Sequence, residues 1–494
     1  MTSSPTSIRR SLRLLGPDCD ARVSHDSDLP APSQALFPPR EARTRVEDQL
    51  TRALADARER VLQGPVMPTI DRARLREELA RFDFVTPRPL EELLAWTLQQ
   101  MEQGVVHMNH PRYFGLFNPA ANFPSECADR ISGAFNPQLA SSGSSPAPVE
   151  IEAHVIRAIA RRAGLPPESA GHFTTAGSEA NYTALICALT RAEPRFGTDG
   201  VRAFAGPVAM YTSRECQPAW FKIAHQAGIG RAALRLIGTD GKGRLDAGAL
   251  AQALVHDRAR GIVPVLISTT AGTTGAGMID PLTECARIAR EHGVWHHVDA
   301  AWGGAALASE RLRGLLAGIE LADSLTIDAH KWFATTMGCG MFITRYPQTL
   351  SEAFRVSADF MPSSVAQLDP YLNTMQWSRR FLGLRLFLSL AAAGWQGYGE
   401  HVERSVELIA RLKERLLARG WSIANDSHLA VLCVVPPPGS PKIRDIVRRV
   451  LESGRAWVAV STYEGREVLR ICATHGESTL ADVEELVVAL TATA

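Results

Sequence analysis

Ile327-Asp328-Ala329-His330-Lys331-Trp332 follows directly on an apolar run that is typical of a buried strand. Upstream, His297-Val298-Asp299-Ala300-Ala301-Trp302-Gly303-Gly304 places Asp299 at the end of another such run. A lysine is costly to bury unless its charge is paired or removed, and a buried carboxylate needs a cationic partner. Two charged residues at the ends of successive strands therefore indicate chemistry rather than packing.

The chemistry that suits this pair is that of an aldehyde cofactor with a pyridine ring. A Schiff base removes the charge of a lysine, and an aspartate beside a pyridine nitrogen keeps that nitrogen cationic. Lys331 and Asp299 are thus the two anchors that pyridoxal 5'-phosphate requires. The alternative, a surface lysine and an aspartate that caps a helix, explains either residue alone better than it explains both.

Composition narrows the remaining classes. The chain has 494 residues, enough for two or three domains, and its formal net charge of +1 favours neither nucleic acid nor an anionic membrane as partner. Its eight cysteines are scattered without metal-binding spacing, which favours reduced thiols in a cytoplasmic protein and no metal site. No apolar run approaches the roughly 18 residues of a membrane span.

The order of the expected elements predicts an α/β protein in four parts. Residues 1–42 are expected to form a flexible leader, 43–106 a helical segment, 107–377 a large cofactor-binding domain, and 378–494 a small α+β domain. In the large domain, strands alternate with helices, which predicts a mostly parallel sheet covered on both faces. The expected strands are His172–Thr175, Val208–Thr212, Val263–Thr269, Val294–Val298, Ser324–Ile327, Gly340–Thr344, Leu429–Val435, Val458–Ser461 and Val468–Ala473. The expected helices are Glu41–Gln63, Leu75–Phe82, Leu90–Gln103, Glu179–Thr190, Trp220–Ala227, Ala247–Ala259, Leu282–His292, Glu310–Leu316, Ser378–Arg419 and Thr479–Leu490.

Two loops of small residues precede the anchors. One contains Gly177 and Ser178 between an expected strand and helix, and the other is Ala271–Gly275. Small residues let a backbone approach a ligand, and a helix N-terminus attracts an anion. Either loop alone is explained as a helix cap or a plain turn, so only their order ahead of Asp299 and Lys331 favours a phosphate site.

This order of motifs resembles the group II amino acid decarboxylases, the pyridoxal-phosphate family that acts on aromatic amino acids, glutamate, cysteine sulfinate and diaminobutyrate. The resemblance spans roughly residues 45 to 490. It implies fold type I with a mostly parallel seven-stranded sheet, a homodimer with active sites at the subunit interface, and decarboxylation of a free L-amino acid through an aldimine and a quinonoid. The motifs that carry it are His297–Gly304, Ala322–Ser324, Asp328–Trp332, His110–Phe114, Ser145–Ala147, Gln376–Arg380 and Val468–Arg470.

Roles follow from the resemblance residue by residue. It implies that Lys331 forms the internal aldimine, that Asp299 pairs with the ring nitrogen, and that His330 lies near the phosphate. Gly177 and Ser178 would supply phosphate donors.

Other positions would surround the ring and the substrate. Ala301 would pack on one ring face and Thr273 would lie close to the cofactor. Gln217 stands where the family more often has a histidine on the other ring face, although glutamate decarboxylases have glutamine there, and this leaves the reaction specificity open. The alternative is that the motif is shifted by one residue. Arg470 matches a position that meets a substrate carboxylate in glutamate decarboxylases, although a surface salt bridge also explains it.

The substrate pocket and the proton donor are less defined. Phe117 and Asn118 belong to a segment that lines the side-chain pocket in relatives, where apolar residues favour an aromatic or aliphatic substrate. The sequence of the motif His297–Gly304 instead favours an acidic substrate. The loop from Phe354 to Trp377 holds two candidates for the catalytic tyrosine position, Tyr371 and Phe360. Tyr371 predicts simple decarboxylation, whereas Phe360 predicts oxidative formation of an aldehyde.

Other outcomes of the same cofactor remain open, namely transamination and retro-aldol cleavage. A catalytically silent relative is disfavoured because Lys331 and Asp299 are both present.

Overall fold

The computed structural model describes residues 31–356 and 369–492 of the chain. The chain divides into two compact units, one of residues up to 63 together with 69–105, and one of residues 64–68 together with 106–494. The division 107–377 and 378–494 within the second unit remains a prediction. No helix in the described ranges is long and apolar enough to cross a membrane.

The first unit is helical. It contains α2 (Ala31–Gln34), α3 (Arg40–Gln63), α4 (Arg72–Leu79) and α5 (Leu90–Gln103). An ion pair of 2.7 Å between Arg60 and Glu102 joins α3 to α5. Helix α2 and the start of α3 lie inside the predicted leader, so the end of that leader is helical, and the prediction for residues 1–30 falls outside the described residues.

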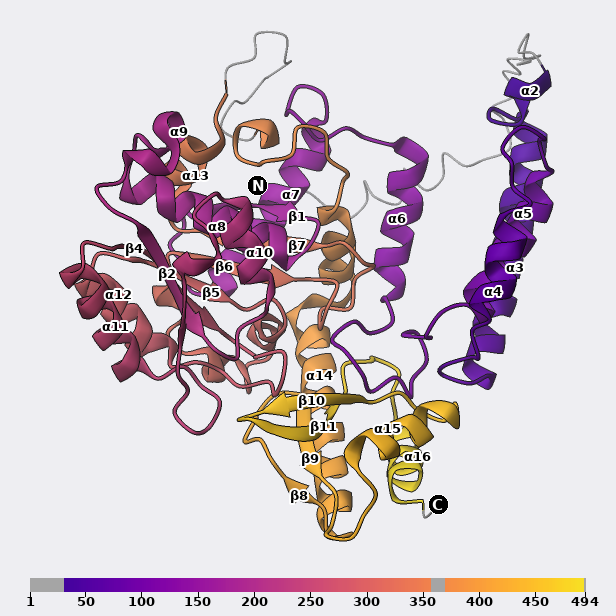
Figure 1. Ribbon diagram of the computed structural model, residues 1–494. Helices are drawn as coiled ribbons and strands as arrows, with labels where there is room; N and C mark the ends of the chain where they lie inside the picture. The colour runs from indigo at the N-terminus through magenta and orange to yellow at the C-terminus, as the bar shows by residue number, and fades with distance from the viewer. Residues whose placement is uncertain (1–30, 357–368, 493–494) are drawn as a thin grey trace, which may run out of the picture. The chain divides into compact units, whose positions relative to one another are not determined.

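The second unit is built on a seven-stranded sheet in the order β1-β7-β6-β5-β4-β2-β3 (Figure 1). Only β7 runs against its neighbours, and the other strands are parallel to one another. The fold is therefore α/β and mostly parallel, as predicted. The strands are β1 (Ala170–Thr174), β2 (Val208–Ser213), β3 (Leu234–Ile237), β4 (Val263–Thr270), β5 (Trp295–Asp299), β6 (Ser324–Asp328) and β7 (Gly340–Thr344).

Helices cover both faces of this sheet because its strands are apolar on both sides. On one face, α8 (Gly177–Ala192) and α10 (Ala219–Gln226) pack over Met210, Leu266 and Trp295. On the other, α11 (Ala247–Ala259) and α12 (Leu282–Glu291) pack over Tyr211 and Ile267. The remaining helices of this part are α6 (Phe123–Phe135), α7 (Pro146–Arg162), α9 (Phe196–Asp199) and α13 (Pro347–Phe354).

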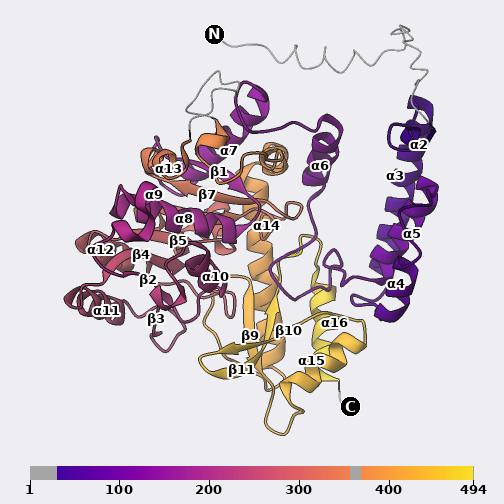
Figure 2. The same ribbon diagram turned by 45° about the horizontal axis from the view of Figure 1, so that its top comes forward.

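A second, antiparallel sheet follows in the order β10-β11-β9-β8. Helix α14 (Gly383–Leu417) runs from the first sheet to the second (Figure 2). It bends at Gly394, whose left-handed φ of 64° breaks the helical geometry. The other elements here are β8 (Ser422–Ile423), β9 (Val431–Val435), β10 (Ala459–Tyr463), β11 (Arg466–Cys472), α15 (Ile443–Glu452) and α16 (Leu480–Thr491).

The structure corrects several sequence-based expectations. The expected helix Glu310–Leu316 is only a short 3-10 turn at Arg313–Leu316, because the segment is brief and Gly314 interrupts it. Strand β3 was missed since it is a four-residue edge strand. Helix α7 was missed because prolines at its first turn resemble loop sequence, although proline suits that position. The helix expected from Ser378 begins at Gly383.

Candidate active site

Asp299 is the last residue of β5, so its carboxylate lies at the carboxyl ends of the parallel strands, where α/β sheets bind ligands. The residue is 5% exposed. Its Oδ2 accepts a hydrogen bond of 2.8 Å from Asn181 Nδ2, and its Oδ1 accepts one of 3.1 Å from the Ala301 N–H. Burial raises the pKa of the Asp299 carboxyl, and the nearby positive charge of Lys331 opposes that rise.

Lys331 lies just beyond the end of β6. Its Nζ is 2.9 Å from Asp328 Oδ2, and its side chain is 21% exposed. The Asp328 carboxylate is buried, and its other oxygen, Oδ1, has no hydrogen-bond partner within the described ranges. The lysine amine therefore lies between solvent and two buried carboxylates.

Gly177 begins α8 and brings the small-residue loop to this pair. The preceding Ala176 forms no side-chain cap, and the first N–H groups of a helix have no partner within it. A Cβ on Gly177 would lie 2.9 Å from Asp328 Oδ2 and 3.4 Å from the Ala301 methyl group. Only glycine fits here without displacing its neighbours. Ser178, the next residue, is exposed.

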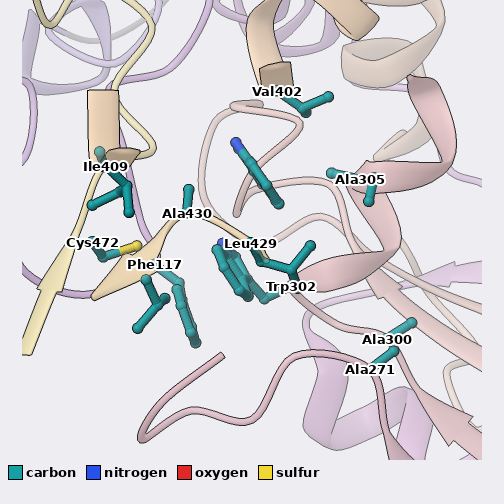
Figure 3. Packing of buried hydrophobic residues seen from close by; sticks show 14 of the residues in the cluster. Phe117, Ala271, Ala300, Trp302, Ala305, Val402, Ile409, Leu429, Ala430 and Cys472 are labelled. Atoms are coloured by element: carbon teal, nitrogen blue, oxygen red, sulfur yellow. The ribbon is translucent and has the colours of Figure 1, made fainter. Parts of the chain in front are cut away.

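A stack of planar side chains runs from Trp332, the residue that follows Lys331, to Arg470. The rings of Trp332 and Trp302 are 4.8 Å apart at 10°, and those of Trp302 and Phe117 are 4.3 Å apart at 14°. The Arg470 guanidinium caps the stack 4.5 Å above the Phe117 ring. Figure 3 shows Phe117 beside Trp302 within the apolar core. Gly272 makes room for Trp302, since its φ is +99° and a Cβ there would lie 2.8 Å from the indole.

Arg470 is 3% exposed and only partly satisfied. Its Nε donates to the Thr274 carbonyl at 2.8 Å and its Nη1 to the Gly115 carbonyl at 2.6 Å. No partner for its buried Nη2 lies among the described residues. One arm of this guanidinium thus has no acceptor among residues 31–356 and 369–492.

Three predicted cofactor residues have local structural roles. Thr273 Oγ1 accepts a hydrogen bond of 3.0 Å from the Met278 N–H and so closes its own loop. Gln217 is exposed, and its Oε1 accepts from the Ala219 N–H at the start of α10. His330 is buried with Nδ1 3.3 Å from the Cys339 N, and burial lowers its pKa. Their roles toward the cofactor remain predictions.

Asn118 and Tyr371 are not joined to Lys331 or Asp299 by any contact recorded in the described part of the chain. Asn118 Nδ2 is 3.2 Å from Met337 Sδ. The Tyr371 ring is buried beside Trp377, 5.1 Å between centroids. Phe360 lies outside the described residues.

Comparison with known proteins assigns the chemistry. Residues 83–434 match the pyridoxal-dependent decarboxylase conserved domain. The chain belongs to this family.

Related decarboxylases act on different amino acids. The aromatic-L-amino-acid decarboxylase of Bacillus atrophaeus is 26% identical over 447 residues, which cover 87% of this chain and 91% of that protein. An acidic amino acid decarboxylase of Mus musculus is 30% identical over 352 residues, covering 69% of this chain and 64% of that protein.

Solved structures support the fold. The crystal structure of mouse CSAD is 25% identical, with a TM-score of 0.85 over 91% of this chain and 98% of that one. Oryza sativa TDC with PLP and tryptamine is 24% identical, with a TM-score of 0.84 over 94% of this chain and 98% of that one. The chain is therefore a pyridoxal-phosphate-dependent amino acid decarboxylase with the type I fold.

The residues of this decarboxylase fit the cofactor. Asp299 is a buried carboxylate whose recorded hydrogen bonds come from neutral donors, which suits a protonated ring nitrogen. The space at Gly177 would be lost to any side chain, and Ala176 leaves the helix N-terminus uncapped for a phosphate. Lys331 has a reachable amine.

Sequence reasoning missed three residues of this decarboxylase site. Asn181 lies one helical turn after Gly177, and that i, i+4 spacing placed it on the same face of α8. Asp328 ends β6, where a buried carboxylate beside the expected Schiff-base lysine was a signal in itself. Trp302 was quoted within a motif, but its stacking depends on tertiary packing.

We predict that Gly177→Ala weakens cofactor binding about tenfold, because the new methyl group overpacks the space between Asp328 and Ala301. Titration of the cofactor-free protein with pyridoxal 5'-phosphate, followed by absorbance, measures the dissociation constant. Gly197→Ala in α9 is the matched control, since no atom lies within 4 Å of its added Cβ. Equal affinity in the two variants would contradict the placement of the site.

Proposed function

We propose that this decarboxylase converts a free L-amino acid to its amine with simple loss of carbon dioxide, with the cofactor held covalently through Lys331 Nζ. The observation that carries the proposal is the common site of Lys331, Asp299 and Gly177 at one edge of the sheet. The oxidative alternative rests on Phe360, which lies outside the described residues, and no contact among the described residues favours transamination or retro-aldol cleavage.

The bound cofactor supplies an electron sink for the bond that breaks. Asp299 keeps the ring nitrogen protonated by placing a fixed negative charge beside it. The N–H groups of Gly177 and Ser178 would hold the phosphate, and the Ala301 methyl would pack against the ring. Gln217, Thr273 and His330 complete the cofactor surroundings in this proposal.

Arg470 binds a substrate carboxylate. The free Nη2 supports this role because an unsatisfied buried donor is costly unless a ligand supplies the acceptor. The Phe117 ring beneath the guanidinium and the two carbonyl acceptors hold the group in one orientation. Phe117 and Asn118 border the substrate side of the site.

Tyr371 returns the proton to the substrate carbon through its hydroxyl. Its segment approaches the phosphate loop: Gln376 Nε2 donates to Glu179 Oε1 at 2.8 Å, and Glu179 Oε2 accepts from the Thr175 N–H, also at 2.8 Å. The segment that carries Tyr371 is thereby fixed beside the N-terminus of α8.

A homodimer completes the site. Helix α6 presents an apolar stripe, the α6 patch, in which Phe123 is 65%, Ile131 45% and Phe135 81% exposed. Met337, 60% exposed, follows Thr336, which contacts α6 through a hydrogen bond to Ser125. A patch of large apolar side chains next to an active site is typical of a surface that another subunit covers.

Product analysis tests the proposal. Cofactor-loaded protein is incubated with aromatic, aliphatic and acidic L-amino acids while carbon dioxide release and oxygen uptake are followed together. We expect an amine and carbon dioxide in equal amounts, without oxygen uptake. Lys331→Ala is expected to abolish both turnover and the chromophore that borohydride traps. Aldehyde with oxygen uptake, or a keto acid, would overturn simple decarboxylation, and a fully active Lys331→Ala would overturn the assignment altogether.

We predict that Arg470→Met raises the KM for the substrate about 10- to 100-fold, the usual effect of losing a hydrogen bond to a charged group. Methionine keeps the apolar contact with Phe117 and removes the donor arms. Arg466→Met, at the exposed start of the same strand, is the control and should leave KM unchanged. An unchanged KM in both variants, with cofactor affinity intact, would exclude Arg470 from substrate binding.

Replacement of Phe135 by aspartate is expected to shift the protein from dimer to monomer, because a charge would be buried in the proposed interface. Light scattering after size exclusion measures the mass. Val255→Asp is the control, since Val255 is 59% exposed on α11, outside the α6 patch. A wild-type monomer with full activity would contradict the dimer.

A further inference from the structure

A continuous line of hydrogen bonds leads from Asp299 back into the sheet. Asn181 Nδ2 donates to Asp299 Oδ2 at 2.8 Å, and Asn181 Oδ1 is 3.0 Å from His297 Nε2. His297 Nδ1 is 2.8 Å from Ser324 Oγ, which accepts a bond of 2.8 Å from Trp295 Nε1. Each of these residues is at most 5% exposed.

The two ends of the line give it one direction. An indole N–H can only donate, and an ionised carboxylate can only accept. With Asp299 ionised, Asn181 turns its amide nitrogen to the carboxylate and its oxygen to His297, so His297 Nε2 carries a proton. The Ser324 hydroxyl, which accepts from Trp295, donates to His297 Nδ1. Every group in the line then donates toward Asp299.

The charge state of His297 agrees with this arrangement. Burial lowers the pKa of His297 to about 3, and a backbone hydrogen bond with Ser324 opposes that shift, so the ring is neutral near pH 7 and has a single proton to place. Thr326 Oγ1, 3.2 Å from Nε2, offers a second acceptor for that proton. The Trp220 ring meets the imidazole edge-on at 6.0 Å between centroids and limits its rotation.

We propose that His297 and Asn181 are positioning residues of the decarboxylase, and that the line from Trp295 through Ser324 holds His297 as the Nε2-protonated tautomer, so that Asn181 keeps Asp299 ionised and aimed at the cofactor ring. The inference rests on the proposed pairing of Asp299 with the ring nitrogen. The opposite tautomer would turn the Asn181 oxygen toward Asp299, which only a protonated carboxyl could satisfy.

A buried histidine with satisfied nitrogens also has a purely structural reading, and the neighbouring residue distinguishes the two. His296 is equally buried on β5, but its Nε2 meets Thr269 Oγ1 at 3.0 Å, and no recorded contact among the described residues links it to Asp299. Loss of either ring should cost stability. Only loss of His297 should alter the cofactor site.

Three variants separate these roles. His297→Leu is expected to raise the cofactor dissociation constant about tenfold, the lower end of the effect of a hydrogen bond on a charged group, and to lower kcat while KM stays within about twofold. His297→Gln should restore much of the affinity, because its amide N–H can take the place of Nε2–H. His296→Leu should lower the thermal midpoint without changing the cofactor dissociation constant.

The tautomer is observed directly in the holoenzyme. With ¹⁵N-labelled histidine, the ring nitrogens of His297 are assigned by their loss in His297→Leu, and a protonated Nε2 with an unprotonated Nδ1 is expected. The opposite tautomer, or equal affinities in His297→Leu and His296→Leu, would overturn the proposal.

Asp299→Asn distinguishes failure of this inference from failure of the proposed function. If Asp299→Asn binds the cofactor weakly and His297→Leu binds it normally, the positioning role of His297 is wrong, but the pairing of Asp299 with the ring nitrogen stands. Normal binding in Asp299→Asn removes the pairing on which both proposals rest.

Discussion

Much of this structure depends on keeping one carboxylate charged in the interior. Asp299 ends β5 between β4 and β6, where burial opposes ionisation. Neutral donors at 2.8 and 3.1 Å and the charge of Lys331 offset part of that cost, although the pKa of Asp299 stays raised. The parallel sheet brings these groups together, because the ends of β5 and β6 and the N-terminus of α8 all meet at one edge.

A second buried carboxylate, that of Asp328, lies at the same edge of the sheet and restricts which residues fit there. Asp328 contacts Lys331 and leaves no space for a side chain at Gly177. Its Oδ1 has no hydrogen-bond partner among the described residues, and its Oδ2 lies beside Gly177, which is part of the proposed phosphate site. The amine of Lys331 is a positive charge close to both carboxylates: it contacts Asp328 and acts electrostatically on Asp299.

Features that depend on neighbouring residues in the sequence could be predicted, whereas contacts between distant segments could not. Lys331 and Asp299 could be identified because a charged residue at the end of an apolar run is visible in the sequence alone. The helices α8, α11 and α12 followed from periodicity, whereas α7 was hidden by prolines at its start. The partners of Asp299 come from α8 and from the next residues of its own loop, and the tautomer of His297 depends on Ser324, one strand away. Such relations need the folded chain, because sequence spacing says nothing about which polar atoms meet across strands.

The stack of Trp332, Trp302, Phe117 and Arg470 also bears on how such an enzyme diverges. Its members come from four separate segments of the chain. Each packs against the next, so a substitution at one position changes the packing of its neighbour. A substitution of Phe117 that suits a new substrate would also change the packing of Trp332, the residue that follows Lys331. Substitutions along the stack should therefore be strongly epistatic, and new specificities in this lineage would be reached through concerted replacements rather than single steps.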